Sequence, residues 1–404
     1  MIGNRRRRLW SRVAGWLSVA VAAALVAASL TAYVRYRTVW NSIDRISISG
    51  LGERPARPDG ALNVLLIGSD SRSGANRSFG AGIQGQRSDT IMILHISPGR
   101  RGATVLSIPR DSMVPTLACA AAGPGVPGQQ ADPGQSERIN ATYANGGPAC
   151  LWKTVEHQTG IRLDHFIALT FTGFERIVND IGGVNICLPQ AVNDPDSGLH
   201  LAAGLHHVMG AEALAFWRER HIGAGSDLQR IQRDQFLMAS LLQGIARSDV
   251  LGSPAKIYSI AVDAAGAMTT DAGLDLGTML RIADSLRGLS SRSVQFVQVP
   301  EIPYPPDPAA EVMFQQPEAS ALFSAIAHDT ALPAPARGGK ADRAPRGAAT
   351  PTTSPRSPSA SPSSASPGVT NLNKTYGGIN GNAKACHDQA AFSGTDAPSD
   401  FPGS

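Results

Sequence analysis

The sequence predicts an α/β protein: a three-layer α-β-α sandwich with a mixed central sheet, preceded by one N-terminal transmembrane helix. Three observations lead to this prediction. Strand-like apolar runs interleave with segments of helical period, which is typical of a sheet with helices on both faces. Two neighbouring strands are joined by a tight turn, so at least one strand pair is antiparallel. An uncharged stretch near the N-terminus is long enough to span a bilayer.

The N-terminal region has the pattern of a membrane anchor. Residues 1–13 contain Arg5–Arg8 and are predicted to be a cytoplasmic basic tail, and residues 14–34 carry no charge and are predicted to be the transmembrane anchor. Because the basic cluster precedes the span, the positive-inside rule places the N-terminus in the cytoplasm and the rest of the chain outside the membrane. A cleaved signal peptide is the alternative, but the apolar run is longer than a usual signal-peptide core.

The remainder divides into three parts by composition. We interpret residues 35–60 as a stalk, residues 61–331 as one extracytoplasmic catalytic domain, and residues 332–404 as a disordered tail rich in Pro, Ser and Ala. Hydrophobic residues make up 42% of the 404, which suffices for a sizeable core. The net charge of +4 owes much to the N-terminal arginines and the basic linker, so it does not indicate nucleic-acid binding.

The first strands of the domain bring an acid and a base together. An apolar run at 63–67 is a strand, and the runs at 91–97 and 103–108 form a hairpin around a turn at 98–102. Counting outward from this turn places Asp89 and Arg110 at about the same level, near the open end of the hairpin.

Further elements follow in alternation. Strands are predicted at 165–170, 184–188 and 293–299, and helices at 152–159, 172–180, 210–220, from Ser226 onward, and at 273–286. The helix at Ser226 has a serine N-cap, Gln229 three residues later, and apolar residues along one face. Gly182-Gly183 ends the predicted helix at 172–180.

Four cysteines outside the membrane fit an oxidising compartment. Cys119 and Cys150 bracket a loop rich in Gly, Pro and Gln, so their pairing is the first choice. Cys187 and Cys386 remain, and the sequence alone does not pair them.

The first candidate cluster consists of Asp70, Arg87, Asp89 and Arg110, all at predicted strand ends. Ligands of open α/β sheets gather where strands stop. Two carboxylates that converge on one point repel each other unless a cation lies between them, and Mg²⁺ binds one or two carboxylates together with phosphate oxygens. The alternative is an ordinary surface, in which Asp70 caps a turn, Asp89 pairs with Arg87 and Arg110 pairs with its neighbour.

The second candidate cluster is cationic and contains Arg218, Arg220, Arg230 and Arg233. Arg230 falls in the first turns of the helix that begins at Ser226, where free backbone N–H groups and the helix dipole favour an anion. Guanidinium groups there add bidentate recognition of phosphate. The alternative is a solvated basic face that Glu219 and nearby aspartates neutralise.

At these residues the chain resembles the LytR-CpsA-Psr family of membrane-anchored enzymes that attach glycopolymers to bacterial peptidoglycan. The resemblance extends from about residue 63 to 242. Its motifs are Leu65-Leu66-Ile67-Gly68-Ser69-Asp70-Ser71-Arg72, Arg87-Ser88-Asp89-Thr90, Ser107-Ile108-Pro109-Arg110-Asp111, Arg138-Ile139-Asn140-Ala141, Gly182-Gly183-Val184, Ala213-Leu214-Ala215-Phe216, Arg218-Glu219-Arg220-His221, and Asp227-Leu228-Gln229-Arg230-Ile231-Gln232-Arg233. Cys119, Cys150 and the run Gly146-Gly147-Pro148 resemble actinobacterial members. Trp217 is bulkier than the aliphatic residue expected at that position.

The resemblance implies a phosphotransferase that acts on the outer face of the membrane. It implies that Asp70 and Asp89 hold Mg²⁺, that both share the chemistry with Arg110, and that the pyrophosphate of the substrate is bound by Arg87, Arg110, Arg218, Arg220 and Arg230. The implied reaction moves a glycosyl phosphate from a polyprenyl-pyrophosphate-linked glycan to a peptidoglycan hydroxyl. Hydrolysis of the same lipid, or non-catalytic wall binding and regulation, are the alternatives.

Overall fold

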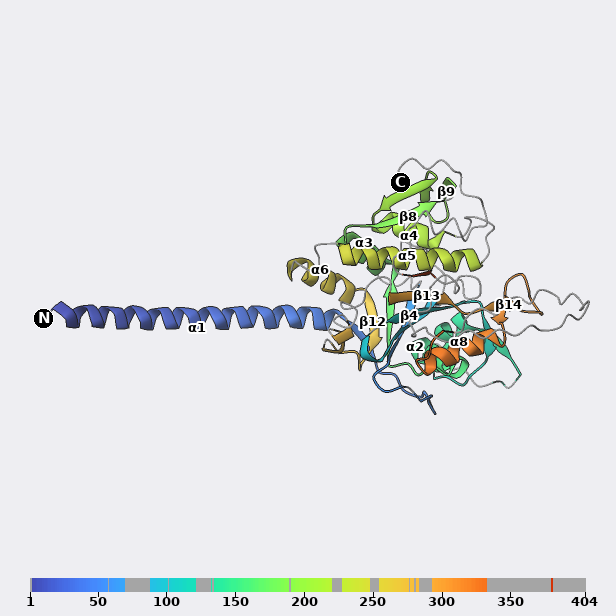
Figure 1. The fold of residues 1–404 in the computed structure, drawn as a ribbon, viewed down its shortest axis with the longest axis horizontal. Coiled ribbons are helices and arrows are strands. Elements are labelled where there is room, and N and C mark those ends of the chain that lie inside the picture. The colour runs from blue at the N-terminus through green and yellow to red at the C-terminus, as the bar shows by residue number, and fades with distance from the viewer. Residues whose placement is uncertain are drawn as a thin grey trace, which may run out of the picture.

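The computed structural model describes residues 2–56, 58–69, 88–100, 102–120, 132, 134–188, 190–219, 227–247, 254–275, 277–279, 281–282, 293–332 and 379–380. A central sheet lies between two helical layers, and one long helix projects from the domain (Figure 1). The three-layer α-β-α architecture predicted from the sequence is therefore confirmed.

The central sheet has eight strands in the order β1-β12-β7-β2-β3-β4-β13-β16. Their bounds are β1 (Asp44–Ile46), β12 (Met268–Asp271), β7 (His165–Thr170), β2 (Leu62–Ser69), β3 (Ser88–Ile96), β4 (Ala103–Ile108), β13 (Val294–Gln298) and β16 (Ile379–Asn380). Strand β2 is parallel to β7 and antiparallel to β3, and β4 is antiparallel to β3 and parallel to β13. The sheet is thus mixed, as expected.

Four short two-stranded sheets surround it. They pair β5 (Met113–Pro115) with β6 (Ser136–Arg138), β8 (Val184–Leu188) with β11 (Gly204–Val208), β9 (Val192–Asp194) with β10 (Leu199–Leu201), and β14 (Glu301–Pro303) with β15 (Val312–Phe314). The strand predicted at 184–188 therefore belongs to a peripheral hairpin. It lies on the side of the central sheet where α4 and α5 lie (Figure 1).

Helices cover both faces of the sheet. Their bounds are α1 (Ile2–Ser42), α2 (Ile139–Thr159), α3 (Phe171–Asp180), α4 (Gly210–Arg218), α5 (Asp227–Arg247), α6 (Pro254–Ala265) and α8 (Glu318–Ala327). Figure 1 shows α2 and α8 below the sheet and α3 to α6 above it. The lower interface is the core that contains Phe166 and Leu151, and the upper one contains Met92 and Phe236.

Local chemistry explains where two predicted helices begin. Thr170 caps α3, because its hydroxyl oxygen accepts a hydrogen bond from the N–H of Gly173 at 3.3 Å. The helix predicted over 273–286 begins later than expected: residues 277–279 and 281–282 are helical. The side chain of Asp275 accepts the N–H of Thr278 at 2.6 Å, which places the N-cap at Asp275.

The first half of α2 is not predicted by the sequence pattern. This helix starts at Ile139, thirteen residues before the predicted start, and it contains a kink at Gly147, where φ is 65°. Pro148 follows, and it cannot continue an unbroken helical hydrogen-bond ladder. The Gly-Gly-Pro sequence weakens the helical pattern, but the chain is helical on both sides of the kink, where tertiary packing stabilises it.

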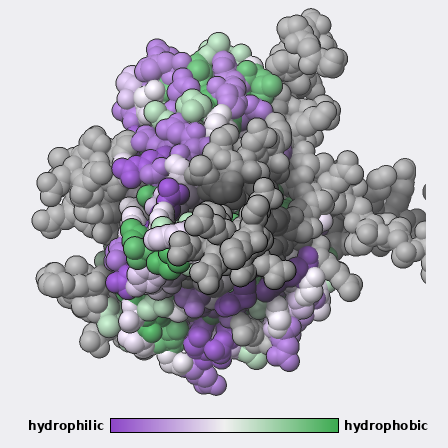
Figure 2. Space-filling model, turned by 90° about the vertical axis from the view of Figure 1, so that its left-hand side faces the viewer, coloured by the Kyte–Doolittle hydropathy of each residue, from purple (hydrophilic) through white to green (hydrophobic). Residues whose placement is uncertain are grey.

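Helix α1 runs without a break from the basic N-terminus into the domain (Figure 1). Its residues Ala14–Ser42 are apolar and long enough to cross a membrane. The segment interpreted as a stalk begins inside α1 and then forms β1, which pairs in parallel with β12 at the edge of the sheet. Val39 and Ile43 are buried against Ala265 of α6, so the helix is fixed to the domain. Seen along α1, apolar side chains show in the middle of a mainly hydrophilic face (Figure 2).

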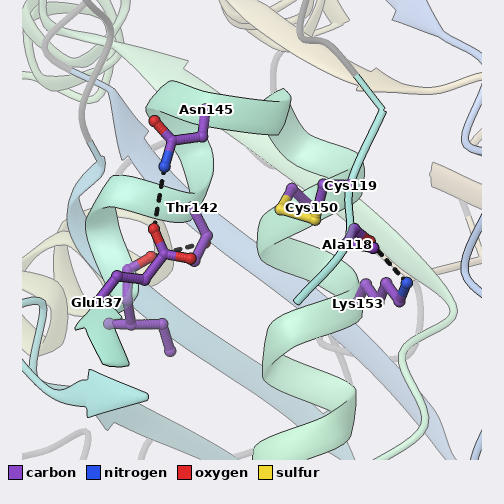
Figure 3. Close-up of a disulfide and its surroundings, with 8 residues drawn as sticks. Ala118, Cys119, Glu137, Thr142, Asn145, Cys150 and Lys153 are labelled. Atoms are coloured by element: carbon purple, nitrogen blue, oxygen red, sulfur yellow. Dashed lines mark hydrogen bonds between the residues drawn. A yellow bond between two sulfur atoms is a disulfide. The ribbon is translucent and has the colours of Figure 1, made fainter. Parts of the chain in front are cut away.

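A disulfide bond joins Cys119 to Cys150 of α2, with a Cα–Cα distance of 5.5 Å. Figure 3 shows it beside α2, with the ammonium of Lys153 donating to the carbonyl of Ala118 at 2.8 Å. The first-choice pairing is thus present. Cys187 is also disulfide-bonded, and no described cysteine is free. Cys386 lies outside the described residues.

Candidate functional site

The open end of the β3–β4 hairpin brings Asp89 and Arg110 into contact. The register pairs Ile91 with Ile108, and Nη1 of Arg110 donates to Oδ1 of Asp89 at 2.5 Å. Both side chains are less than one fifth exposed. The prediction that these two residues lie at the same level is confirmed, and the ion pair is sheltered enough to be stronger than a typical surface pair.

A β-bulge sets the position of Asp89. Gly68 of β2 pairs with Thr90, whereas Ser69 pairs with Ser88, so Asp89 is the extra residue on β3. Bulges re-aim side chains and are common next to functional sites. The bulge therefore accounts for a carboxylate at the very end of the sheet, directed at Arg110.

Arg110 is held at a second point. Its Nε donates to Oδ2 of Asp111 at 3.1 Å. Asp111 lies 3.8 Å from Nη1 of Arg138, whose Nε in turn donates to Glu311 at 3.2 Å. The guanidinium of Arg110 is thus oriented by two carboxylates, and Arg138 and Glu311 tie this arrangement to the loop before β15. The sequence motif contained Asp111 and Arg138 but gave no reason to expect Glu311, which is distant in sequence.

The end of α4 lies on the ends of strands β2 and β3. Gly68 has no side chain, and a Cβ atom placed there would lie 3.0 Å from two ring atoms of Trp217 and 3.1 Å from Cβ of Thr90. Gly68 therefore allows Trp217 to approach the strand ends. The Trp217 ring also packs on Phe171 and Phe174, with centroids 6.0 and 4.7 Å apart. This contact brings the segment with the second arginine cluster to the same end of the sheet as Asp89.

Arg218, the last residue of α4, lies near the first turn of α3. Its guanidinium carbon is 5.9 Å from the centroid of the Phe171 ring. Burial raises the pKa of the Glu175 carboxyl, and the positive charge of Arg218 opposes that shift. Arg218 is thus partly sheltered over an aromatic ring, a setting that strengthens its interaction with an anion.

Glu219, which follows Arg218, is fully buried. Its Oε2 accepts the hydroxyl of Ser197 at 2.9 Å, and its carbonyl accepts Nη2 of Arg233 at 3.0 Å. Hydrogen bonds from Ser197, and one with Glu219, hold the pKa of Asp194 well below its usual range. The alternative interpretation of the sequence placed Glu219 on a solvated face. In the structure Glu219 is buried and connects the end of α4, the β9–β10 hairpin and α5.

The structure describes only part of the candidate set. Asp70, Arg87 and Arg220 lie outside the described residues. Arg230 lies within the first turns of α5, as predicted, but its side chain lies outside the described part. The described members that share the strand-end region are Asp89 and Arg110, with Arg218 next to the tryptophan that covers it.

The described residues contain no cluster of three or more His, Cys, Asp or Glu side chains that could hold a metal ion. A carboxylate cage is not required for Mg²⁺, which keeps several waters and binds one or two carboxylates plus phosphate oxygens. Asp89 is an oxygen donor of the right kind at the strand ends, so the described donor set fits a magnesium ion held mainly by substrate and water.

Comparisons with known proteins agree with this geometry. The probable cell wall biosynthesis protein LcpB of Corynebacterium glutamicum is 31% identical over 292 residues, which are 71% of this chain and 66% of that protein. The chain thus spans just under two thirds of the length of that relative. The polyisoprenyl-teichoic acid–peptidoglycan teichoic acid transferase TagU of Bacillus anthracis is 25% identical over 65% of this chain and 80% of its own length.

A solved structure shows the same fold. The LytR-Csp2A-Psr enzyme from Actinomyces oris superposes with a TM-score of 0.53 at 22% identity, covering 71% of this chain and 96% of that one. The model of the LytR_cpsA_psr family matches residues 31–323, which include the end of α1 and the strand ends with their two arginine clusters. The chain therefore belongs to the LytR_cpsA_psr family.

Proposed function

We propose that this protein is a cell-wall ligase that transfers a glycosyl phosphate from a polyprenyl-pyrophosphate-linked glycan to peptidoglycan. The observation that carries the proposal is the arginine at the strand ends that two carboxylates orient: Arg110 on Asp89 and Asp111. Fixed guanidinium groups neutralise the charge that develops on phosphate oxygens, and phosphoryl transfer requires positioning and charge neutralisation more than covalent help from the protein.

The reaction balances without a further reactant. A hydroxyl oxygen of peptidoglycan forms a bond to the phosphorus next to the glycan, and the bond from that phosphorus to the bridging oxygen breaks. The products are a phosphodiester between glycan and peptidoglycan, and polyprenyl phosphate. Arg110 and Arg218 bind the phosphate oxygens, together with Arg87, Arg220 and Arg230. The proton of the attacking hydroxyl passes to a carboxylate, for which Asp89 is a described candidate.

Magnesium is part of the proposal. Asp89 and Asp70 would hold Mg²⁺, which would supply positive charge next to the pyrophosphate. The chemistry of the donors supports this assignment, because both residues are carboxylates. Asp89 lies at the start of β3, and Asp70 follows the last residue of β2 in the sequence.

The anchor supports a lipid-linked donor. Helix α1 continues from the apolar span directly into the domain, and β1 joins the sheet two residues after α1 ends. A domain held this close to the bilayer meets a substrate whose polyprenyl chain stays in the membrane. The cytoplasmic N-terminus and the extracytoplasmic domain follow from the arginines that precede the span.

The test is product analysis by mass spectrometry with the full-length protein in detergent micelles. The substrates are a polyprenyl-pyrophosphate glycan and a peptidoglycan oligomer, with and without Mg²⁺. We expect a phosphodiester-linked conjugate that is lost in Arg110→Ala and without the metal. The matched control is Arg176→Ala, an exposed arginine of α3. Free glycan phosphate would identify a hydrolase, and bound but unchanged donor would identify a non-catalytic binding protein.

A further inference from the structure

Four side chains, three on one face of the central sheet and one on α5, have buried polar atoms without a hydrogen-bond partner. The atoms are Oγ1 of Thr90, Oγ of Ser107, Oε1 of Gln298, and both amide atoms of Gln235. Gln235 is 0% exposed, and Ser107 and Gln298 are each 3% exposed. We call these four residues the polar row.

The strand register places three of the four side by side. Gln298 of β13 pairs with Ser107 of β4, and Ser107 pairs with Met92 of β3. Thr90 is two residues from Met92 on the same face, so it is the diagonal neighbour of Ser107. Diagonal Cα atoms lie about 7–8 Å apart, and the side chains are closer, so one oxygen atom between the two hydroxyls could accept both.

Gln235 faces the other three residues of the polar row from α5. Along the strands, side chains alternate between faces, and the apolar neighbours on the face of the polar row belong to the core cluster that α5 covers: Met92, Val105, Phe296, Phe236 and Ala239. Gln235 lies one turn before Ala239, on the same side of the helix. The start of α5 is held near the end of α4 by the bond from Arg233 to Glu219, so Gln235 lies toward the strand ends.

Buried polar atoms without a partner indicate a site for a bound group. Each buried donor or acceptor without a partner is costly, and native proteins pair nearly all of them with protein, water or a bound group. Five such atoms, on four residues, lie on this side of the sheet, toward the strand ends that carry Asp89. The hydroxyls of Thr90 and Ser107 and the amide N–H group of Gln235 are neutral donors, which suit an oxyanion whose charge the nearby arginines balance.

We propose that the polar row binds the lipid-side phosphate of the donor, the phosphate directly attached to the polyprenyl chain. This proposal rests on the proposed function and adds uncharged ligands to the arginines. The lipid-side phosphate is preferred over the glycan-side phosphate because the row is buried and continues into apolar side chains on the same face. The two hydroxyls and the amide N–H of Gln235 donate to its non-bridging oxygens.

The test compares stability and binding in one set of variants. In the full-length protein in detergent micelles, Ser107→Ala, Gln235→Met and Gln298→Met each remove an unpaired polar group. We expect the melting temperature of the ligand-free protein to rise by about 2–4 °C per group. We expect affinity for polyprenyl monophosphate, which carries only the lipid-side phosphate, to fall about tenfold in Ser107→Ala and in Gln235→Met, as for one lost hydrogen bond to a charged group. We expect it to stay unchanged in Gln298→Met, because the unpaired atom of Gln298 is an acceptor.

The matched control is Thr154→Val in α2. Thr154 is equally buried and its hydroxyl also lacks a partner, but it lies on the opposite side of the sheet. It should raise the melting temperature and leave the affinity unchanged. Unchanged affinity in Ser107→Ala and Gln235→Met, or no binding of polyprenyl monophosphate by the wild type, would overturn the proposal and leave the row to ordered water. Absence of transferase activity in the wild-type protein would count against the proposed function alone, because the binding comparison does not depend on turnover.

Discussion

Replacing Arg110 with lysine separates charge from orientation. Arginine reaches Asp89 through Nη1 and Asp111 through Nε at the same time. A lysine ammonium keeps the positive charge, but it is a single point and cannot reproduce two fixed directions while facing a phosphate. The variant tests whether the proposed ligase activity needs an oriented guanidinium or only a cation at the strand ends.

The magnitude follows from the burial of the pair. The side chains of Arg110, Asp89 and Asp111 are 19%, 17% and 11% exposed, so solvent screens them less than a surface pair. A hydrogen bond to a charged group in such a setting contributes about 1.5–3 kcal/mol. Loss of one oriented contact to the transferring phosphate would then lower kcat/KM by about ten- to 150-fold.

The assay is the rate of conjugate formation with saturating and limiting donor, and a melting curve of each variant. Arg176→Lys is the matched control, because that arginine is exposed on α3. Glu311→Gln should give a smaller loss, since Glu311 acts on Arg110 only through Arg138 and Asp111. A lysine variant with wild-type kcat/KM and an unchanged melting temperature would refute the claim that the two carboxylates orient a working guanidinium.

Three further predictions concern the surroundings of the site. Gly68→Ala places a methyl group 3.0 Å from the Trp217 ring, so we expect a loss of about 1–3 kcal/mol in the free energy of unfolding and slower transfer. Denaturant titration measures the first effect and product analysis the second. Gly182→Ala is not a suitable control, because the φ angle of Gly182 is positive. Paired replacement of Cys119 and Cys150 by serine opens a loop with a sequence separation of 31, and chain entropy gives a loss of about 3.7 kcal/mol, which the same titration measures. The lowered pKa of Asp194 stabilises the fold above the unfolded pKa near 3.9, and this contribution is lost as pH falls through the lower folded value. Ser197→Ala should therefore destabilise the protein at pH 6 and have less effect as the pH drops below about 3; an effect independent of pH would contradict the assignment.

Sequence reasoning succeeded where the pattern is local. The hairpin register followed from a short turn and alternating strands, and so did the contact of Asp89 with Arg110. The long apolar N-terminal helix followed from an uncharged stretch, and the disulfide from two cysteines that flank one loop. It failed at the first half of α2, because Gly147 and Pro148 weaken the helical signal that packing restores.

Charge pattern alone also misplaced Glu219. Between Arg218 and Arg220 it reads as one charge of a solvated face, yet it is fully buried and bonded to Ser197. Nothing local distinguishes a carboxylate that neutralises its neighbours in solvent from one that ties two elements together. The partner is 22 residues away, in a hairpin whose position depends on the whole upper layer.

The sequence by itself determined the fold class, the long apolar N-terminal helix and the family, because these depend on composition, on periodicity and on short motifs. Only the tertiary structure decided which polar groups meet. Glu311 reaches Arg138 across 173 residues, and Gln298 lies beside Ser107 through a parallel pairing that no local pattern specifies. Long-range packing positions these groups, since the free energy that holds them comes from burial of the whole sheet between its helical layers.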